Sequence, residues 1–201
     1  MSTKHWGTLI LDALHIEAAH VVGTSLGGMI AQTMAIEHPQ RVRSLTSIMS
    51  ASGPGAAIGE DSTNDEVSEK SLTMDLSDPS TYVDLQVEGY RAISGPHFDA
   101  DYMRDIVQRS FDRCYHPAGW SYQMMAVLAS GDRTEQLGSL TMPVLVIHGG
   151  VDPLILPEAG EATAAAIPGA KFIVIDDMGH NFPRLRWAEI ADAIAEVAAK
   201  G

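Results

Sequence analysis

The chain has 201 residues, of which 45% are hydrophobic and 19% charged, and its formal net charge is −13. This composition is typical of a globular protein with enough apolar material for one substantial core. The acidic balance disfavours nucleic acids and anionic membranes as partners, since both repel negative charge. The single cysteine, Cys114, excludes an intrachain disulfide and a metal site built from several cysteines.

The sequence predicts neither a membrane-spanning helix nor a secretion signal. No apolar run approaches the roughly 18 residues that a bilayer requires. Residues 1–7 lack the apolar region of a signal peptide. We therefore expect a cytoplasmic protein without a membrane partner.

Residues 1–50 predict a helix followed by a strand–helix–strand unit. The first helix is expected over Thr8–Ala18. Its apolar stripe consists of Leu9, Ile10, Ala13 and Leu14. A short strand, His20–Thr24, leads into a helix that ends near Glu37, because His38 precedes a proline and avoids the helical region. A second strand is expected over Val42–Met49, and a helix between two strands is typical of a parallel crossover.

Residues 51–137 differ in character and predict an inserted helical block, because no alternating β pattern appears there. The segment Glu60–Asp78 is rich in Ser, Thr, Asp and Glu, which indicates a solvated stretch. Three helices are expected, over Pro79–Ser94, Asp99–Cys114 and Ala118–Ser130.

From residue 138 the alternation of strands and helices resumes. Strands are expected over Pro143–Gly149 and Lys171–Ile175, and helices over Pro157–Ile167 and Trp187–Ala199. The chain as a whole predicts an α/β fold, with a mostly parallel sheet of about four strands and helices on both faces. Its parts are 1–50 (first part of the core), 51–137 (helical insertion) and 138–201 (second part of the core).

The segment Gly23-Thr24-Ser25-Leu26-Gly27 lies where the first strand turns into the following helix. Gly-x-Ser-x-Gly in this context is typical of a nucleophile elbow, a strained turn that exposes the serine hydroxyl. We expect no room for a side chain at Gly23 or Gly27, and close helix–strand packing at Gly28. The helix start favours negative charge developing beside Ser25. A flexible Gly/Ser loop is the alternative explanation of so short a motif.

A serine nucleophile needs a base, and the base needs an orienting acid. In open α/β sheets such groups are expected at the carboxyl ends of the strands. Asp152 follows the third predicted strand and His180 follows the fourth. The chain order Ser25, Asp152, His180 is that of the α/β-hydrolase triad.

Other residues compete for these roles. Asp176 and Asp177 lie nearer to His180 in the sequence and are alternative acids, although turn formation also explains them. Asp152 has a turn as its alternative role, and His148 is expected to be structural. No metal-ligand pattern is evident, so we expect neither a metal nor a cofactor.

The chain resembles the α/β-hydrolase superfamily, in the branch that holds aclacinomycin methylesterase, proline iminopeptidases and haloperoxidase-like proteins without cofactor. The resemblance rests on Gly23–Gly28, on His148-Gly149-x-x-Asp152-x-x-x-Pro157 and on Gly179-His180. It implies Ser25 as nucleophile, His180 as base and then acid, and Asp152 as the carboxylate that holds His180. It also implies that the helical insertion is a cap over the site.

The resemblance further implies that about four strands before the elbow are absent. One oxyanion donor is expected to be the backbone N–H of Leu26, while the loop that normally supplies the second is absent. Loss of one such donor costs about 10²–10³-fold in rate. The strand His20–Thr24 is then an exposed edge, which predicts a homodimer through Val21–Thr24 or the helix Thr8–Ala18.

We therefore expect a serine hydrolase that acts on small-molecule carboxylic esters rather than lipids, through an acyl-enzyme. Trp120, Met124 and Met125 are candidates for the acyl pocket, with helix packing as their alternative role. Peptidase, C–C hydrolase and perhydrolase chemistry remain compatible with the same triad. A second hypothesis is a weak or inactive domain that acts by self-association.

Overall fold

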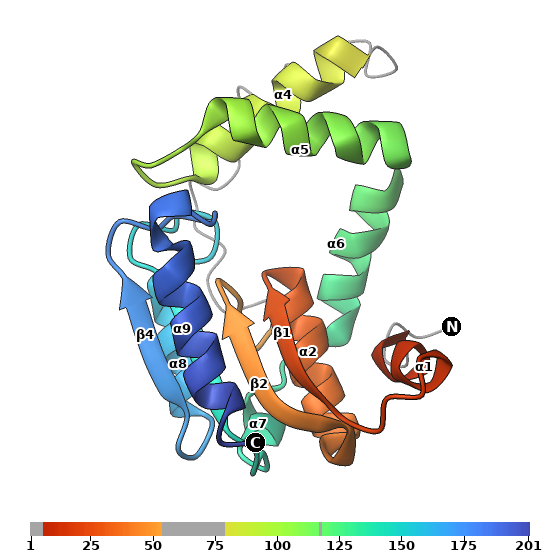
Figure 1. Cartoon of the computed structure of the whole chain (residues 1–201), viewed down its shortest axis with the longest axis vertical. Coiled ribbons are helices and arrows are strands. Elements are labelled where there is room, and N and C mark those ends of the chain that lie inside the picture. The colour runs from red at the N-terminus through yellow and green to blue at the C-terminus, as the bar shows by residue number, and fades with distance from the viewer. Residues whose placement is uncertain (1–5, 54–78, 117) are drawn as a thin grey trace.

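The computed structural model describes residues 6–53, 79–116 and 118–201. Its centre is a parallel four-stranded sheet in the order β1-β2-β3-β4 (Figure 1). The strands are β1 (Ala19–Thr24), β2 (Val42–Ile48), β3 (Val144–Gly149) and β4 (Lys171–Ile175). The predicted α/β fold is thus confirmed, with strand ends within one residue of those expected. The predicted solvated segment Glu60–Asp78 lies outside the described residues.

Eight helices and two 3₁₀ turns are described around this sheet. The helices are α1 (Trp6–Ala13), α2 (Leu26–Glu37), α4 (Pro79–Ile93), α5 (Ala100–Arg113), α6 (Ala118–Ser130), α7 (Thr134–Leu137), α8 (Pro157–Ala165) and α9 (Trp187–Ala198). The 3₁₀ turns are η2 (Pro39–Arg41) and η4 (Arg184–Arg186). The single-turn helix α7 is too short to leave a periodic pattern in the sequence. In the part of the chain that the structure describes, none of the helices has the length and apolar character to cross a bilayer.

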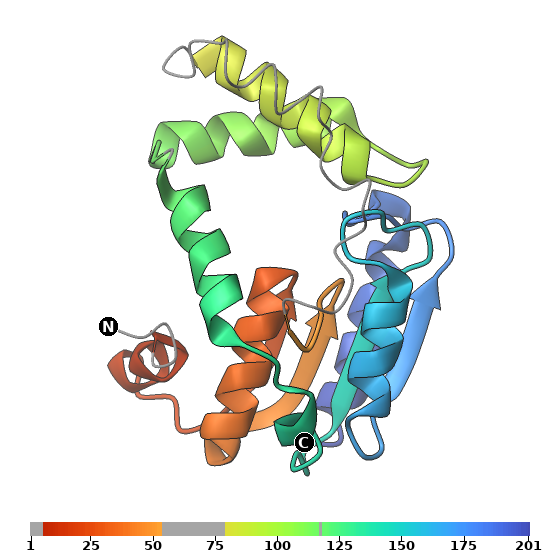
Figure 2. The same ribbon diagram turned by 180° about the vertical axis from the view of Figure 1, so that it is seen from behind.

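Helices cover both faces of the sheet, as Figures 1 and 2 show from opposite sides. Because the strands follow one another in chain order, right-handed crossovers place α2 and α8 on the same face. That face holds a buried cluster in which Met34 and Ala35 of α2 pack with Leu45 and Val146. On the other face, α9 packs Ile190 and Val197 over β2, β3 and β4. Strand β1 extends beyond α9, so Val22 is 46% exposed.

Helix α1 departs from the sequence-based expectation. Leu11 packs into the core, whereas Leu9, Ile10 and Leu14 are 54%, 57% and 62% exposed. The predicted apolar stripe of α1 is therefore wrong, because only the side with Leu11 faces another described element. The helix ends at Ala13 rather than Ala18, since His15 adopts a positive φ of 56°.

Helices α4, α5 and α6, the arch helices, stand over the carboxyl ends of the strands (Figures 1 and 2). α4 and α5 lie side by side and bury Val83 and Val87 against Val107. α6 runs from the end of α5 back toward α2. No strand occurs among the described residues between β2 and β3, as the helical pattern predicts.

A buried arginine ties together the two points where the arch helices leave and rejoin the sheet. Arg133 is 6% exposed, and its guanidinium donates to the Ala51 carbonyl oxygen at 3.3 Å and the Ser130 hydroxyl at 3.0 Å. Its backbone N–H donates to the Ser52 carbonyl oxygen at 2.9 Å, and the Ser52 and Thr134 hydroxyls are 2.8 Å apart. Burial lowers the pKa of Arg133. The arch is therefore fixed to the sheet at its base.

Candidate active site

The turn between β1 and α2 holds Ser25 in a strained backbone conformation. Its φ of 53° and ψ of −122° lie in a region that non-glycine residues seldom adopt. Such conformations cost about 1–3 kcal/mol and persist only where the surroundings enforce them. The Ser25 N–H donates to the Ile48 carbonyl oxygen at 2.9 Å, and its own carbonyl accepts from the Gly28 N–H at 2.9 Å. The neighbouring strand and the helix thus enforce the turn together.

The glycines of the motif have unequal roles. A Cβ atom at Gly23 would overlap the Gly27 carbonyl, as expected. A Cβ at Gly27, in contrast, would meet no atom within 4 Å, so the expectation of a crowded Gly27 is wrong. At Gly28 a Cβ would lie 2.6 Å from that of Ser50, which agrees with close packing of α2 against the end of β2.

Ser50 supports the turn in a way that the sequence analysis missed. Its hydroxyl donates to the Ser25 carbonyl oxygen at 2.7 Å, so the end of β2 holds the strained residue through a side chain. A hydroxyl-bearing residue directly after the strand that pairs with the elbow strand was the available signal.

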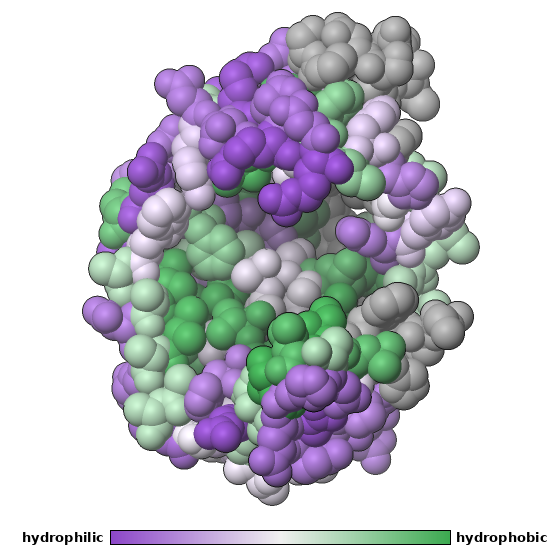
Figure 3. All heavy atoms as spheres, turned by 45° about the vertical axis from the view of Figure 1, so that its right-hand side comes forward, coloured by the Kyte–Doolittle hydropathy of each residue, from purple (hydrophilic) through white to green (hydrophobic). Residues whose placement is uncertain are grey.

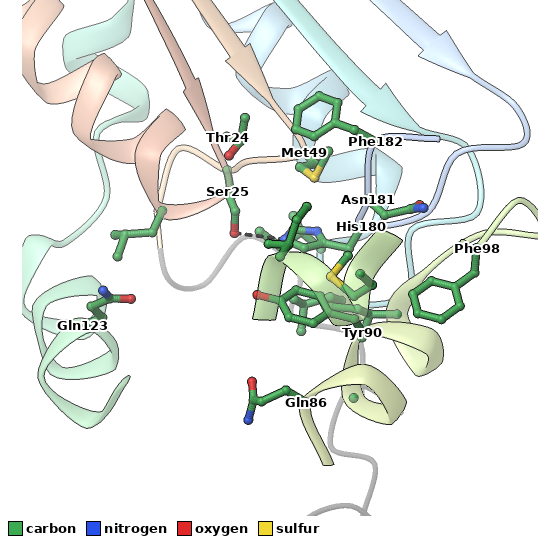
Figure 4. Close-up of a pocket in the computed structure, with 18 of the residues that line it drawn as sticks. Thr24, Ser25, Met49, Gln86, Tyr90, Phe98, Gln123, His180, Asn181 and Phe182 are labelled. Carbon is green, nitrogen blue, oxygen red and sulfur yellow. Dashed lines mark hydrogen bonds between the residues drawn. The ribbon is translucent and has the colours of Figure 1, made fainter. Parts of the chain in front are cut away.

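The structure brings Ser25, His180 and Asp152 into one hydrogen-bonded chain (Figure 4 shows the first two). His180 Nε2 lies 2.9 Å from Ser25 Oγ, and His180 Nδ1 lies 2.8 Å from Asp152 Oδ2. Since a carboxylate can only accept, Nδ1 carries the proton and Nε2 is left to accept from the serine hydroxyl. The Asp152 side chain is fully buried and that of His180 is 8% exposed.

The loop after β3 positions Asp152 with backbone groups. Asp152 Oδ1 accepts from the N–H groups of Leu154 and Ile155 at 2.9 and 3.0 Å. The other carboxylate oxygen is thereby directed at His180. Asp152 has the turn role considered as its alternative and contacts the histidine as well.

His148 is buried behind this carboxylate. Its Nε2 donates to the Ile155 carbonyl oxygen at 2.9 Å and lies 3.7 Å from Asp152 Oδ2. Burial lowers the pKa of His148, so the imidazole is neutral beside the acid. It does not touch Ser25 or His180 in any hydrogen bond among the described residues, in line with the expected structural role.

Asp177, the alternative acid, has other partners. Its carboxylate accepts from Arg186 Nε and Nη2 at 2.9 and 2.7 Å, and His97 Nε2 lies 2.9 Å away. The hydrogen bond from Arg186 holds the pKa of Asp177 below its usual value, with His97 adding to the effect. Asp177 therefore links the start of α9 to the segment after α4.

That segment packs directly on the loop that carries His180. The His180 N–H donates to the Ile93 carbonyl oxygen at 2.7 Å, and Asn181 Oδ1 accepts from the Gly95 N–H at 3.3 Å. A Cβ at Gly95 would lie 2.6 Å from the Asp177 carbonyl oxygen and 2.9 Å from the Gly179 nitrogen. The end of α4 thus fixes the backbone of His180.

A cavity of about 630 Å³ opens beside Ser25 and His180. The arch helices form its far wall, and in the space-filling view apolar surface lines a hollow between them and the base of the molecule (Figure 3). Met124 and Leu26 line this cavity. Met125 does not, since it points outward and is 66% exposed. The side chain of Trp120 lies outside the described part of the structure.

The Leu26 N–H is in the position of an anion-binding donor. Leu26 is the first residue of α2, where backbone N–H groups have no partner within the helix and the helix dipole favours negative charge. Among the described residues, no group of three or more His, Cys, Asp or Glu side chains converges as metal ligands would.

The chain is similar in sequence to known hydrolases. Rhodomycin D methylesterase DnrP of Streptomyces peucetius is 31% identical, over 92% of this chain and 68% of its own length. The 2-hydroxymuconate semialdehyde hydrolase of Pseudomonas putida is 29% identical, over 92% of this chain and 61% of its own length. The chain therefore spans about two thirds of the length of these relatives.

A solved structure of a hydrolase from Pseudomonas aeruginosa PA01 has the same fold. It superposes with a TM-score of 0.73 at 21% identity, over 98% of this chain and 71% of that one. A family model described as alpha/beta hydrolase fold matches residues 3–183. With the strand order, the serine turn and these matches in agreement, the chain belongs to the alpha/beta hydrolase fold family.

Proposed function

We propose that this chain is a serine hydrolase of small-molecule carboxylic esters, with Ser25 as nucleophile, His180 as general base and acid, and Asp152 as the orienting acid. The observation that carries the proposal is the hydrogen-bonded chain from Ser25 through His180 to buried Asp152. The methylesterase relative supports hydrolase and esterase chemistry. Residues 51–137 act as a cap over the reacting groups.

The proposed reaction starts from the hydrogen bond between Ser25 Oγ and His180 Nε2. Ser25 Oγ attacks the ester carbonyl carbon while His180 Nε2 takes the hydroxyl proton, and the N–H of Leu26 donates to the oxyanion. The imidazolium returns that proton to the leaving alcohol. Water then gives a proton to Nε2 and attacks the acyl-enzyme, and His180 reprotonates Ser25 as the acid leaves.

Fluorophosphonate labelling tests whether Ser25 is activated. We expect the intact chain to be labelled at Ser25 and to show a burst of p-nitrophenol from p-nitrophenyl acetate. Ser25→Ala should abolish both, and His180→Ala should be nearly as damaging because nucleophile and base act as a unit. Labelling that persists in Ser25→Ala would refute the assignment.

A second candidate function is self-association of a weakly active chain. It is favoured by the exposed apolar residues of α1 and by β1 at the edge of the described sheet. Peptidase, C–C hydrolase and perhydrolase activities share the proposed triad, and substrate profiling after successful labelling separates them from esterase activity.

A further inference from the structure

We propose that the cavity selects esters with a bulky, mostly apolar acid or alcohol part that carries neutral hydrogen-bonding substituents far from the ester. Gln86, Tyr90 and Gln123 of the arch helices would recognise those substituents. The proposal rests on the proposed esterase function for the placement of the ester at Ser25.

The size and lining of the cavity indicate the bulk of the ligand. Pockets of roughly 300–1,000 Å³ hold drug-sized ligands, and this one measures about 630 Å³, far more than a small acyl group fills. Its apolar lining includes Met29, Met49, Phe98, Met103, Ile106 and Phe182. A ligand that fills this space gains most from apolar surface removed from water.

Several polar side chains of the lining already have partners. Asp99 caps α5 by accepting from the Tyr102 N–H, Asn181 accepts from Gly95, and His97 pairs with Asp177. Arg184 lies 3.7 Å from Asp99 and stacks on the rings of Tyr102 and Trp187. Among the described lining residues, Arg184 is the arginine, and its charge already faces the Asp99 carboxylate, which disfavours an anionic substituent as the recognised group.

Gln86, Tyr90 and Gln123 differ from these residues. The amides of the two glutamines and the hydroxyl of Tyr90 have no hydrogen-bond partner among the residues that the structure describes. All three line the cavity, two from α4 and one from α6. A few polar groups converging in an apolar pocket are what fixes the orientation of a ligand.

The directions of these side chains agree with that role. In Figure 4 the amides of Gln86 and Gln123 and the hydroxyl of Tyr90 project into the space that Ser25 also borders. Because the glutamines come from different helices, a ligand with its ester at Ser25 can meet hydrogen-bonding groups on more than one side. Neutral amides and a phenol both donate and accept, so they fit hydroxyl and carbonyl substituents.

A matched pair of esters tests the proposal by binding alone. Methyl 2-naphthoate and methyl 6-hydroxy-2-naphthoate differ by one hydroxyl remote from the ester. Their dissociation constants are measured by fluorescence on the Ser25→Ala chain, which removes turnover. We expect the hydroxylated ester to bind about 3- to 10-fold tighter, the range for one neutral hydrogen bond. Adding Gln86→Leu, Tyr90→Phe and Gln123→Leu together should bring the ratio of the two constants to about one.

Gln136→Leu, at an exposed glutamine of α7 that does not line the cavity, is the matched control and should leave the ratio as in the parent. Equal binding of the two esters to the parent, an unchanged ratio in the triple variant, or no binding at millimolar concentration would overturn the inference. Fluorophosphonate labelling of the intact chain tests the esterase proposal separately. Failure of the esterase proposal and failure of the proposed ligand recognition can therefore be distinguished.

Discussion

At the scale of single residues, the acid that orients His180 can be identified by exchanging each candidate for its amide. Asp152→Asn should lower kcat/KM for p-nitrophenyl acetate by about 10³–10⁴-fold, because an amide no longer holds the productive tautomer. Asp177→Asn should cost far less, since its partners are Arg186 and His97. Steady-state rates with circular dichroism of both variants provide the measurement. A larger loss in Asp177→Asn would mean that the acid has been misassigned.

The buried His148 predicts a pH dependence of stability. Burial lowers its pKa below the roughly 6.5 of a free imidazole. Below that pH the unfolded chain binds a proton at His148 that the folded chain does not, so acid favours unfolding. The contribution of a neutral His148 to the free energy of unfolding is thus fully present above pH 6.5 and decreases as the pH falls.

NMR of the imidazole resonances checks this directly. The ring of His148 should stay neutral to a lower pH than a free imidazole does. Urea unfolding at pH 7.5 and 5.5 should show a smaller loss of stability in His148→Asn than in the parent chain. Equal losses in both, or a ring that is protonated at the pH of a free imidazole or above it, would contradict the prediction.

The residues of the proposed triad could be predicted because each follows a strand whose position the sequence reveals. Ser25 lies in a Gly-x-Ser motif after an apolar run, and Asp152 and His180 follow the third and fourth predicted strands. Local patterns and sheet topology are enough to find these residues. Ser50 and Arg133 could not be found in this way. Ser50 bonds Ser25, 25 residues away, and Arg133 reaches Ala51, 82 residues away, and no local pattern encodes such contacts.

At the scale of elements, the contact between the end of α4 and the His180 loop has no room for an added side chain. In Gly95→Ala the new Cβ would lie within 3 Å of backbone atoms of Asp177 and Gly179, so one segment must move. A displacement of about 1 Å at the base costs on the order of 10²-fold in rate. We expect kcat to fall by about that factor while the chain stays folded.

Gly119→Ala in α6 is the matched control, because its Cβ would approach only the ring of His116, at 3.3 Å. Rates with p-nitrophenyl acetate and thermal melts of both variants compare them. If Gly95→Ala kept the parent kcat, the end of α4 would have no part in positioning His180.

Helix α1 shows what a periodic pattern can and cannot predict. Apolar residues at helical spacing indicate that an amphipathic helix forms, and α1 does form. The pattern carries no information about which side finds a neighbour, and here Leu11 is buried while Leu9 and Ile10 are not. The α2 and β2 boundaries, in contrast, were predictable within one residue because His38-Pro39 and buried runs mark them.

At the scale of the whole molecule, the exposed side of the sheet predicts self-association of the 201-residue chain. Strand β1 has one hydrogen-bonded neighbour in the described sheet, and the chain exposes the apolar side chains of Val22 in β1 and of Leu9, Ile10 and Leu14 in and just after α1. Such an edge tends to pair with another chain. We expect a homodimer at micromolar concentration in light scattering after size-exclusion chromatography.

Ile10→Glu should weaken this dimer, because it places charge in the proposed interface. Leu185→Glu is the control: Leu185 is 56% exposed but lies in η4, directly before α9, which packs over β2, β3 and β4. A monomeric parent chain that binds little apolar dye would defeat the proposal.

Ser25 directly follows β1, the edge strand of the described sheet. This position predicts that activity and folded structure are lost under different conditions. Strands with one neighbour open locally at a lower free energy than the strands they flank. His180 and Asp152 follow β4 and β3, on the other side of β2. When β1 of a monomeric chain frays, Ser25 therefore leaves His180 while most of the sheet is intact. Mild denaturant or warming should therefore abolish the proposed esterase activity before the chain unfolds. Secondary structure that persists under such conditions does not imply that the activity persists.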